Sequence, residues 1–90
     1  MSQQLFNPGR LIATPGALTL SECGTYLISS LMRHLSGDWG DLSSEDKAEN
    51  DFLLRRDLRI FSAYKTPNGC LWIITEADRS ATTFLLPDEY

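Results

Sequence analysis

The segment from Arg59 to Pro87 constrains the fold of this chain most strongly, because its side chains alternate between two faces. In residues 60–65 (IFSAYK) and 70–76 (CLWIITE), side chains of different size and polarity follow one another at every second position, and β-branched and aromatic residues are frequent. Residues 66–69 (TPNG) lie between these runs and combine the fixed φ of proline with two residues that accept a positive φ. The pattern predicts a β-hairpin.

A third strand is expected after this hairpin. Residues 76–80 (EADRS) are polar turn formers, and residues 82–86 (TTFLL) are again β-branched and apolar until Pro87 removes a backbone donor. The three strands should form an antiparallel meander. Because the central strand carries large apolar side chains on both faces, Trp72 on one and Leu71 on the other, helices from the N-terminal half must cover at least one face.

The first third of the chain contains the pattern of an edge strand and of two helices. The apolar run at residues 11–13 (LIA) predicts a fourth strand at an edge of the sheet. Thr14 and Pro15 resemble an N-cap followed by proline at the first helical position, which predicts a short helical turn. A longer helix is expected from residue 21 or 22 to residue 35, with an apolar stripe formed by Leu27, Leu31 and Leu35.

A further helix is predicted in the middle of the chain. Ser43, with Asp46 three positions later, resembles a capping box, and the helix should end near Arg56. Ala48 and Phe52 would form its apolar face.

These patterns predict a single α+β domain over residues 1–90, with residues 1–8 disordered. Two or three helices should pack on one face of a three- or four-stranded antiparallel meander sheet. Ninety residues are too few for a doubly wound nucleotide fold with a separate substrate domain. No apolar run approaches the ~20 residues of a membrane span, so we expect no membrane partner. The first ten residues lack the basic and apolar regions of a signal peptide, which indicates a cytoplasmic protein.

Charge and cysteine content restrict the partners and cofactors that we expect. The net charge of −4 disfavours broad contact with nucleic acid phosphates, although a local basic patch could still bind them. Cys23 and Cys70 lack the spacing of metal ligands, and in the cytoplasm they should be reduced thiols rather than a disulfide. We therefore expect no metal and no cofactor.

Several strings in the chain carry a family resemblance: RHLSGDWGDL, SEDKAEND, RIFSAYK and, most specifically, WIITEADRSATTFLLPDEY at residues 72–90. From Ala13 to Tyr90, the chain resembles a family of small bacterial proteins that are encoded on plasmids and other mobile elements. The resemblance implies such an origin but no particular activity.

Members of this family are often labelled as the M subunit of a type I restriction system, and the residues argue against that label. An adenine methyltransferase needs a glycine-rich cofactor loop in a doubly wound sheet and an Asn/Asp-Pro-Pro-aromatic motif that holds the flipped base. The chain has neither, and residues 7–9 (NPG) do not substitute for the motif.

Three features outside the last turn have both a structural and a functional interpretation. His34 lies at the end of a predicted helix, where an imidazolium would interact favourably with the dipole. Trp39, next to Asp38, could anchor its loop on the core or contact a partner. The acidic residues from 38 to 51 could bind a cation, mimic the phosphate line of DNA or simply form a solvated helix face and first turn. Their charges could also pair with the basic group Arg55, Arg56 and Arg59.

The turn at residues 76–83 contains the most varied chemistry. A carboxylate and a guanidinium, Glu76 and Arg79, lie near hydroxyl groups at a strand end. They could stabilise a phosphoryl transition state or simply lock the turn. The candidate catalytic residues are Glu76, Arg79 and His34, and the candidate binding residues are Trp39, Asp38, Tyr64, Asp78, Arg79, Thr82 and Thr83.

Two functions from different classes follow. The first is a non-enzymatic interaction or accessory regulatory module that binds a protein partner, with a homodimer as a further possibility. The second is a small metal-independent ribonuclease with Glu76 and Arg79 in its site, because helices followed by an antiparallel sheet are also the layout of barnase-type and RelE-type ribonucleases. The first is favoured, because no complete catalytic set is evident in the sequence.

Overall fold

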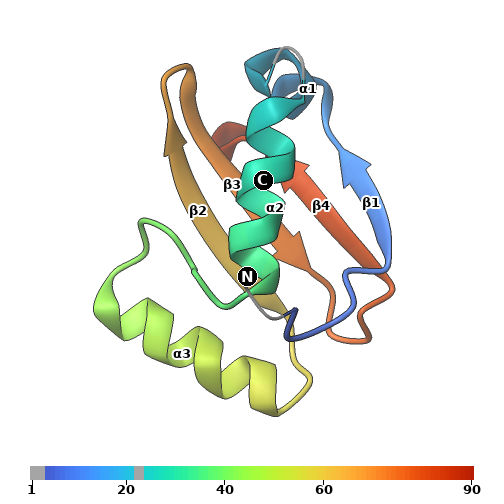
Figure 1. Cartoon of the computed structure of the whole chain (residues 1–90), viewed down its shortest axis with the longest axis vertical. Coiled ribbons are helices and arrows are strands. Elements are labelled where there is room, and N and C mark those ends of the chain that lie inside the picture. The colour runs from blue at the N-terminus through green and yellow to red at the C-terminus, as the bar shows by residue number, and fades with distance from the viewer. Residues whose placement is uncertain (1–3, 22–23) are drawn as a thin grey trace.

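The computed structural model describes residues 4–21 and 24–90 and has an α+β fold (Figure 1). The strands are β1 (Arg10–Ala13), β2 (Ile60–Thr66), β3 (Gly69–Thr75) and β4 (Ala81–Leu85). The helices are α1 (Pro15–Ser21), α2 (Thr25–Leu35) and α3 (Ser44–Arg55), and a short 3-10 turn, η1, covers Pro87–Glu89. The predicted fold class, with helices packed on a four-stranded sheet, is confirmed.

The four strands form one sheet in the order β1-β4-β3-β2. Strands β2, β3 and β4 form the predicted antiparallel meander, in which Ile73 lies opposite both Ser62 and Phe84. Strand β1 is the predicted edge strand, but it runs parallel to β4, with Arg10 opposite Ala81. The sheet is therefore mixed, because alternation along a short edge strand specifies its faces and not its direction.

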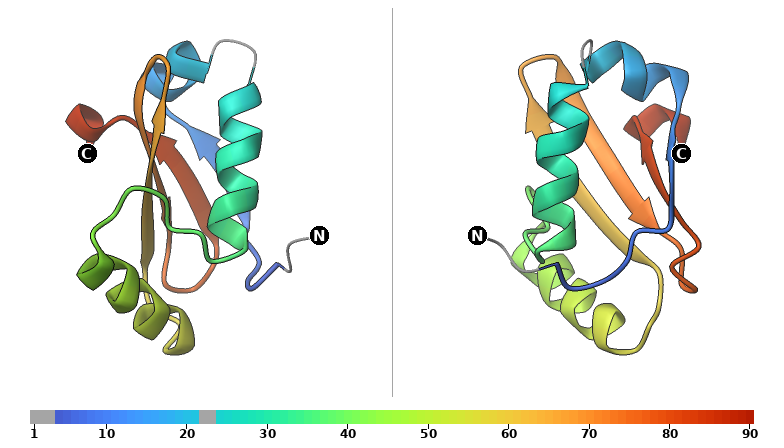
Figure 2. Two further views of the ribbon diagram at one scale, coloured as in Figure 1. Left: turned by 60° about the vertical axis from the view of Figure 1, so that its left-hand side comes forward. Right: turned by 45° about the vertical axis from the view of Figure 1, so that its right-hand side comes forward.

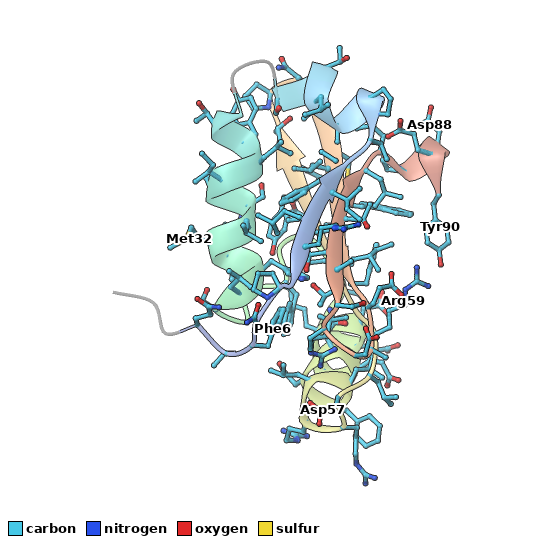
Figure 3. All side chains as sticks on the ribbon, turned by 90° about the vertical axis from the view of Figure 1, so that its right-hand side faces the viewer. Phe6, Met32, Asp57, Arg59, Asp88 and Tyr90 are labelled. Carbon is cyan, nitrogen blue, oxygen red and sulfur yellow. The ribbon has the colours of Figure 1, made fainter. Side chains whose placement is uncertain are left out.

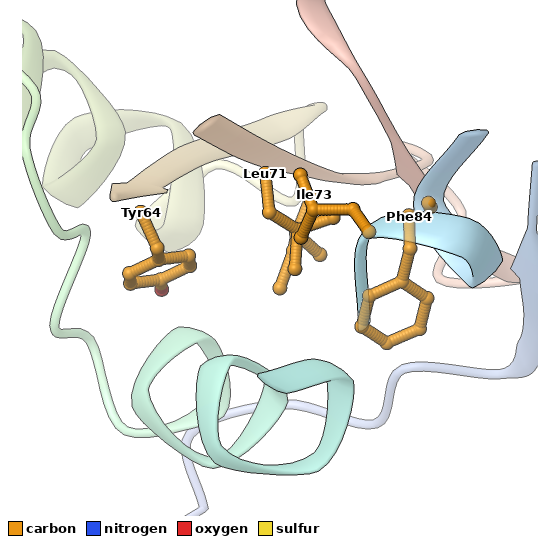
Figure 4. Packing of buried hydrophobic residues seen from close by; sticks show 6 residues of the cluster. Tyr64, Leu71, Ile73 and Phe84 are labelled. Atoms are coloured by element: carbon orange, nitrogen blue, oxygen red, sulfur yellow. The ribbon is translucent and has the colours of Figure 1, made fainter. Parts of the chain in front are cut away.

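Helices α1 and α2 cover one face of the sheet, as the views in Figure 2 show. The buried cluster beneath them contains Ala17, Leu20, Tyr64, Leu71, Ile73 and Phe84 (Figure 4). Leu27 and Leu31 of α2 pack against this cluster, as the predicted stripe requires. Leu71, rather than Trp72, is the residue of the central strand that points toward the helices. Burial of each large aliphatic side chain in this layer contributes about 1.5–3 kcal/mol.

Local capping groups begin the helices near the predicted positions. The Thr14 hydroxyl accepts a hydrogen bond from the Ala17 amide at 3.2 Å, and the Ser43 hydroxyl accepts one from the Asp46 amide at 3.1 Å. Helix α2 begins at Thr25, later than predicted, because Gly24 at φ 83° introduces a turn in front of it.

Helix α3 lies beside the lower end of β2 in Figure 1, and its inward side differs from the prediction. Ala48 and Phe52 are exposed, whereas Asn50 is buried. The Asn50 amide donates to the carbonyl of Phe61 and accepts from the Phe61 N–H. Helix α3 therefore supplies hydrogen-bond partners to the backbone groups at the edge of β2. It does not cover a sheet face, which would require an apolar side on the helix.

The rest of the β2 edge is also closed. The Ala63 amide donates to the Trp39 carbonyl at 3.3 Å, and the Ala63 carbonyl accepts from the Asp41 amide at 2.7 Å. The Asp41 carboxylate accepts from the Lys65 amide at 2.8 Å. No corresponding segment among the described residues pairs with the outer edge of β1.

The segment at residues 4–8 lies against the domain, within the stretch 1–8 for which we predicted disorder. The Leu5 amide donates to the Leu35 carbonyl at 2.8 Å, and the Pro8 carbonyl accepts from the Thr82 hydroxyl at 2.7 Å. Residues 1–3 lie outside the described residues, as does Cys23, whereas Cys70 is half-buried in β3.

Candidate functional site

The sheet face opposite α2 carries a cavity of about 300 Å³ that is open to solvent. Its lining, which we call the aromatic pocket, consists of Arg59, Phe61, Trp72, Ile74 and Tyr90. Among the described elements, α1 and α2 lie on the other face of the sheet, and this face remains open to contact (Figure 2).

Strand register builds the walls of the pocket. Phe61 and Ile74 lie directly opposite each other, and Trp72 follows at the next position on the same face of β3. The rings of Phe61 and Trp72 meet edge to face, with centroids 4.8 Å apart. Tyr90 lies 5.8 Å from Trp72 by the same measure and is 72% exposed. The three rings thus form one continuous apolar surface.

The η1 turn holds Tyr90 in this position. The Glu89 carboxylate accepts hydrogen bonds from the Thr14 hydroxyl at 2.5 Å, from the Gly16 amide at 3.1 Å and from the Leu86 amide at 2.8 Å. These bonds, that from the Thr14 hydroxyl first, lower the pKa of Glu89. Because the carboxylate joins η1 to the start of α1, Tyr90 is positioned over the sheet.

Arg59 adds a charge to the rim of the pocket. Its guanidinium lies 5.7 Å from the Tyr90 ring centroid, and its Nη1 donates to the Tyr90 hydroxyl at 3.3 Å (Figure 3). Its Nε is 3.9 Å from a Glu76 carboxylate oxygen, and both side chains are about half exposed. A long, exposed ion pair of this kind is weak, so Arg59 can exchange Glu76 for another carboxylate.

The interior holds several residues that the sequence marked as candidates. Trp39 and Tyr64 are 2% and 1% exposed, and His34 and Thr82 are fully buried. The Trp39 indole N–H donates to Asp51 at 2.9 Å, and the Tyr64 hydroxyl donates to the Asp38 carbonyl at 2.6 Å. In this fold, these side chains contact the chain itself rather than solvent.

His34 belongs to a buried chain of hydrogen bonds that ends at the Pro8 carbonyl. That end determines which group donates in each bond. The Pro8 carbonyl can only accept, so the Thr82 hydroxyl donates to it, and the Thr75 hydroxyl donates to Thr82 at 2.8 Å. His34 Nε2–H must then donate to Thr75 at 2.8 Å, while His34 Nδ1 accepts from the Ser62 hydroxyl at 2.6 Å.

In the neutral imidazole, both ring nitrogens have a hydroxyl partner in this chain of hydrogen bonds. Burial, and secondly the nearby positive charge of Arg79, lower the pKa of His34 to about 3. The described geometry therefore assigns His34 a structural role in joining α2, β2 and β3.

Arg79 ties the turn between β3 and β4 to the segment between α3 and β2. Its Nη1 donates to the carbonyls of Leu58 at 2.7 Å, Glu76 at 3.1 Å and Ala77 at 3.3 Å. Its guanidinium carbon lies 5.5 Å from the centre of the Phe6 ring.

The neighbouring candidates make local contacts. The Asp78 carboxylate accepts from the Ser80 amide at 3.0 Å, and bonds from Ser80 lower the pKa of Asp78. Thr83 is half-buried on the pocket side of the sheet, opposite Ile74. The candidate catalytic carboxylate, Glu76, pairs with Arg59 on that side, while the His34 side chain of α2 contacts the other face of the sheet, so the two do not converge on one cavity.

Within the described residues, the ion pairs differ from the pairing that was considered between the acidic run and the basic group. Asp38 pairs instead with Arg33 at 2.7 Å, and this contact lowers the pKa of Asp38. Arg56 lies over the ring of Phe52, with 5.1 Å between the guanidinium carbon and the ring centre. Arg59, the third member of the basic group, lies beyond the end of α3 and lines the aromatic pocket.

The sequence contained part of the signal for this pocket. Because side chains alternate along each strand, the sequence places Phe61, Trp72 and Ile74 on one common face of the hairpin. Tyr90 had no such signal, because it reaches the sheet only through the contact of η1 with α1.

Comparisons of the chain with protein-family models, with curated proteins and with solved structures found no match. Within residues 4–21 and 24–90, no helix is both long and apolar enough to cross a bilayer. In the same residues, no group of three or more histidine, cysteine, aspartate or glutamate side chains is arranged to hold a metal ion. The function must therefore be argued from the geometry of the pocket itself.

Proposed function

We propose that this chain is a cytoplasmic, non-enzymatic interaction module, encoded on a mobile element, that binds a protein partner through the aromatic pocket. The observation that carries the proposal is the composition of the pocket. Trp72, Tyr90 and Arg59 are of the three residue types most enriched among energetically dominant interface positions, and they surround one open cavity.

The chemistry of the pocket indicates what the partner presents. The three aromatic rings favour an aromatic or aliphatic side chain, which would lose water on entering the cavity. Arg59 favours a carboxylate beside that side chain, because its present partner Glu76 is distant and exposed. We therefore expect the partner to contribute an apolar residue flanked by an acidic one.

A protein fits this surface better than a nucleic acid does. The chain carries a net charge of −4, and the carboxylate of Glu76 lies beside the single arginine that lines the pocket. A phosphate backbone would bring many negative charges to this acidic chain, whereas a short apolar peptide segment with one acidic residue would bring a single carboxylate, which could take the place of Glu76 at Arg59.

The proposal can be tested by presenting random peptides to the immobilised protein and selecting those that bind. We expect selected peptides to combine an aromatic or large aliphatic residue with a neighbouring aspartate or glutamate. Trp72→Ala and Arg59→Ala should each weaken their binding, while Ile28→Ala, an exposed change on α2, should not. Selection of basic peptides, or binding that survives Trp72→Ala, would contradict the proposal.

The ribonuclease alternative remains a separate hypothesis with its own test. It requires RNA cleavage by the purified protein that is lost on Glu76→Ala. If such cleavage were observed, Glu76 would need a proton donor other than His34, because the imidazole is buried between α2 and the opposite face of the sheet.

A further inference from the structure

A second apolar surface lies on the opposite side of the molecule from the aromatic pocket. A groove of about 260 Å³ runs between β1 and α2, and its lining includes Leu11, Ile12, Leu27, Ile28 and Leu31. Leu11 is 52% exposed and Ile28 is 66% exposed. We call this surface the β1 groove. Figure 3 looks onto it, with β1 in front, α2 beside it and Met32 projecting from the helix.

The backbone of β1 is open along the same surface. The amides of Arg10 and Thr14 donate to the Ser80 and Phe84 carbonyls of the neighbouring β4 side, at 2.9 and 3.0 Å. Since alternate residues of a strand direct their backbone groups to opposite sides, those of Leu11 and Ala13 point away from β4. An unpaired edge next to exposed apolar side chains is a template for another strand.

We propose that β1 pairs with β1 of a second copy of this chain in an antiparallel, two-fold symmetric dimer. The outward groups of Leu11 and Ala13 determine the register: Leu11 of each copy lies opposite Ala13 of the other, and Ile12 lies opposite its own equivalent. This register makes four backbone hydrogen bonds across the axis. It joins the two sheets into one, with both α2 helices on the same face.

The side chains agree with this register. Leu11 and Ala13 lie on the sheet face that α2 covers, because they are opposite Thr82 and Phe84 of β4. The two β1 grooves therefore meet over the seam, and the exposed Leu11 and Ile28 of both copies are covered together. Arg10 falls opposite Thr14, so no like charges are placed face to face.

Charge is the reason why a second copy is the occupant. A chain with a net charge of −4 repels its copy wherever acidic residues meet. Between Arg10 and Leu35 the sequence has one acidic residue, Glu22, which lies outside the described residues, and the described part of this surface has none. Two copies can therefore share the described part without such repulsion. An acidic partner protein would find few basic groups here, since Arg10 and Arg33 are the only arginines or lysines in that described stretch.

The dimer is tested first by its mass as a function of concentration. Sedimentation or light scattering of the full chain should show twice the chain mass of 10.1 kDa. Ile28→Glu, which places a charge in the covered groove, should raise the dimer Kd by about tenfold or more. Phe52→Glu, the same change at an exposed position on α3, should leave it unaltered, as should Trp72→Ala in the aromatic pocket.

The register is tested by a disulfide across the axis, in a chain whose Cys23 and Cys70 are replaced by serine. Ile12→Cys should form a disulfide-linked dimer on mild oxidation, because opposite residues in a pair of this type have Cα atoms about 4.5 Å apart. Arg10→Cys should not, because its equivalents would be separated by about 13 Å. A chain that stays monomeric up to about 1 mM, a dimer unaffected by Ile28→Glu, or equal cross-linking at both positions would each overturn the proposal.

Discussion

The carboxylate of Glu89 accepts a hydrogen bond from the hydroxyl of Thr14 at 2.5 Å, although 75 residues separate them in the chain. The same carboxylate accepts from the Gly16 amide, so it supplements the N-cap of α1. One side chain thus links the start of a helix to the turn that positions Tyr90 in the aromatic pocket. A long-range contact of a polar residue decides the shape of the candidate site.

We predict that Glu89→Gln disturbs the pocket more than the fold. The amide cannot accept on both of its terminal atoms, so the bonds to Thr14 and Gly16 cannot all form, and Tyr90 should move away from Trp72. The tryptophan emission spectrum should change, with little change in Tm. Asp88→Asn, an exposed change in the same turn, is the control, and an unaltered spectrum in Glu89→Gln would contradict the prediction.

Adjacent residues of β3 should respond differently to truncation. Leu71 is fully buried beneath α2, so Leu71→Ala should lower the free energy of unfolding by about 2–5 kcal/mol. Trp72→Ala should lower it less, because Trp72 is only half-buried in the open pocket, but it should weaken peptide binding. Urea unfolding and peptide binding of both variants distinguish the two roles. Equal destabilisation would mean that Trp72 is covered in solution.

The buried imidazole predicts a pH dependence of stability. Since the pKa of His34 falls from its ordinary 6.5 to about 3 in the fold, the unfolded chain binds a proton that the folded chain rejects between these values. The free energy of unfolding should be highest above pH 6.5. Below that pH it should decrease by about 1.4 kcal/mol per pH unit. The free energies of unfolding measured in urea at pH 7 and at pH 5 should differ by about 2 kcal/mol, with the lower value at pH 5.

His34→Gln provides the control for this effect. Glutamine keeps one donor and one acceptor but does not titrate, so the difference between pH 7 and pH 5 should largely disappear. The carboxylates with lowered pKa values, Asp38, Asp78 and Glu89, lose their stabilising effect only at lower pH. A variant with the same pH slope as the parent would show that another group causes it.

The side chain of Asn50 should contribute more to the stability of the fold than a typical polar side chain on a helix. Asn50→Leu leaves the N–H and C=O of Phe61 without their partners, which should cost about 1–3 kcal/mol of stability. Hydrogen exchange at the Phe61 amide should accelerate at the same time. Glu49→Leu, one residue earlier on the exposed side of α3, should change neither quantity.

Arg79 should contribute to stability and not to peptide binding. Arg79→Ala removes a donor to three carbonyls and should lower the free energy of unfolding by about 1–3 kcal/mol. Arg79→Lys should recover part of this, because all three bonds come from one nitrogen and an ammonium group also carries three N–H donors. Loss of peptide binding by a folded Arg79→Ala would instead place this residue in the functional surface.

Local patterns in the sequence determined the elements of this protein. Alternation at residues 60–76 predicted the hairpin, and Thr14 and Ser43 predicted the starts of α1 and α3. The Leu27 and Leu31 stripe predicted which side of α2 is buried. Such features are readable because their causes, side-chain periodicity and the unpaired amides of a first turn, act within a few residues.

Only the tertiary structure decided how these elements serve one another. It placed β1 parallel to β4, gave α3 a polar contact with the β2 edge through Asn50, and brought Tyr90 to Trp72. It also buried His34 among hydroxyl groups from two strands. These outcomes depend on pairs of residues far apart in the chain, and their energies exist only when both partners are in place, so no local pattern encodes them.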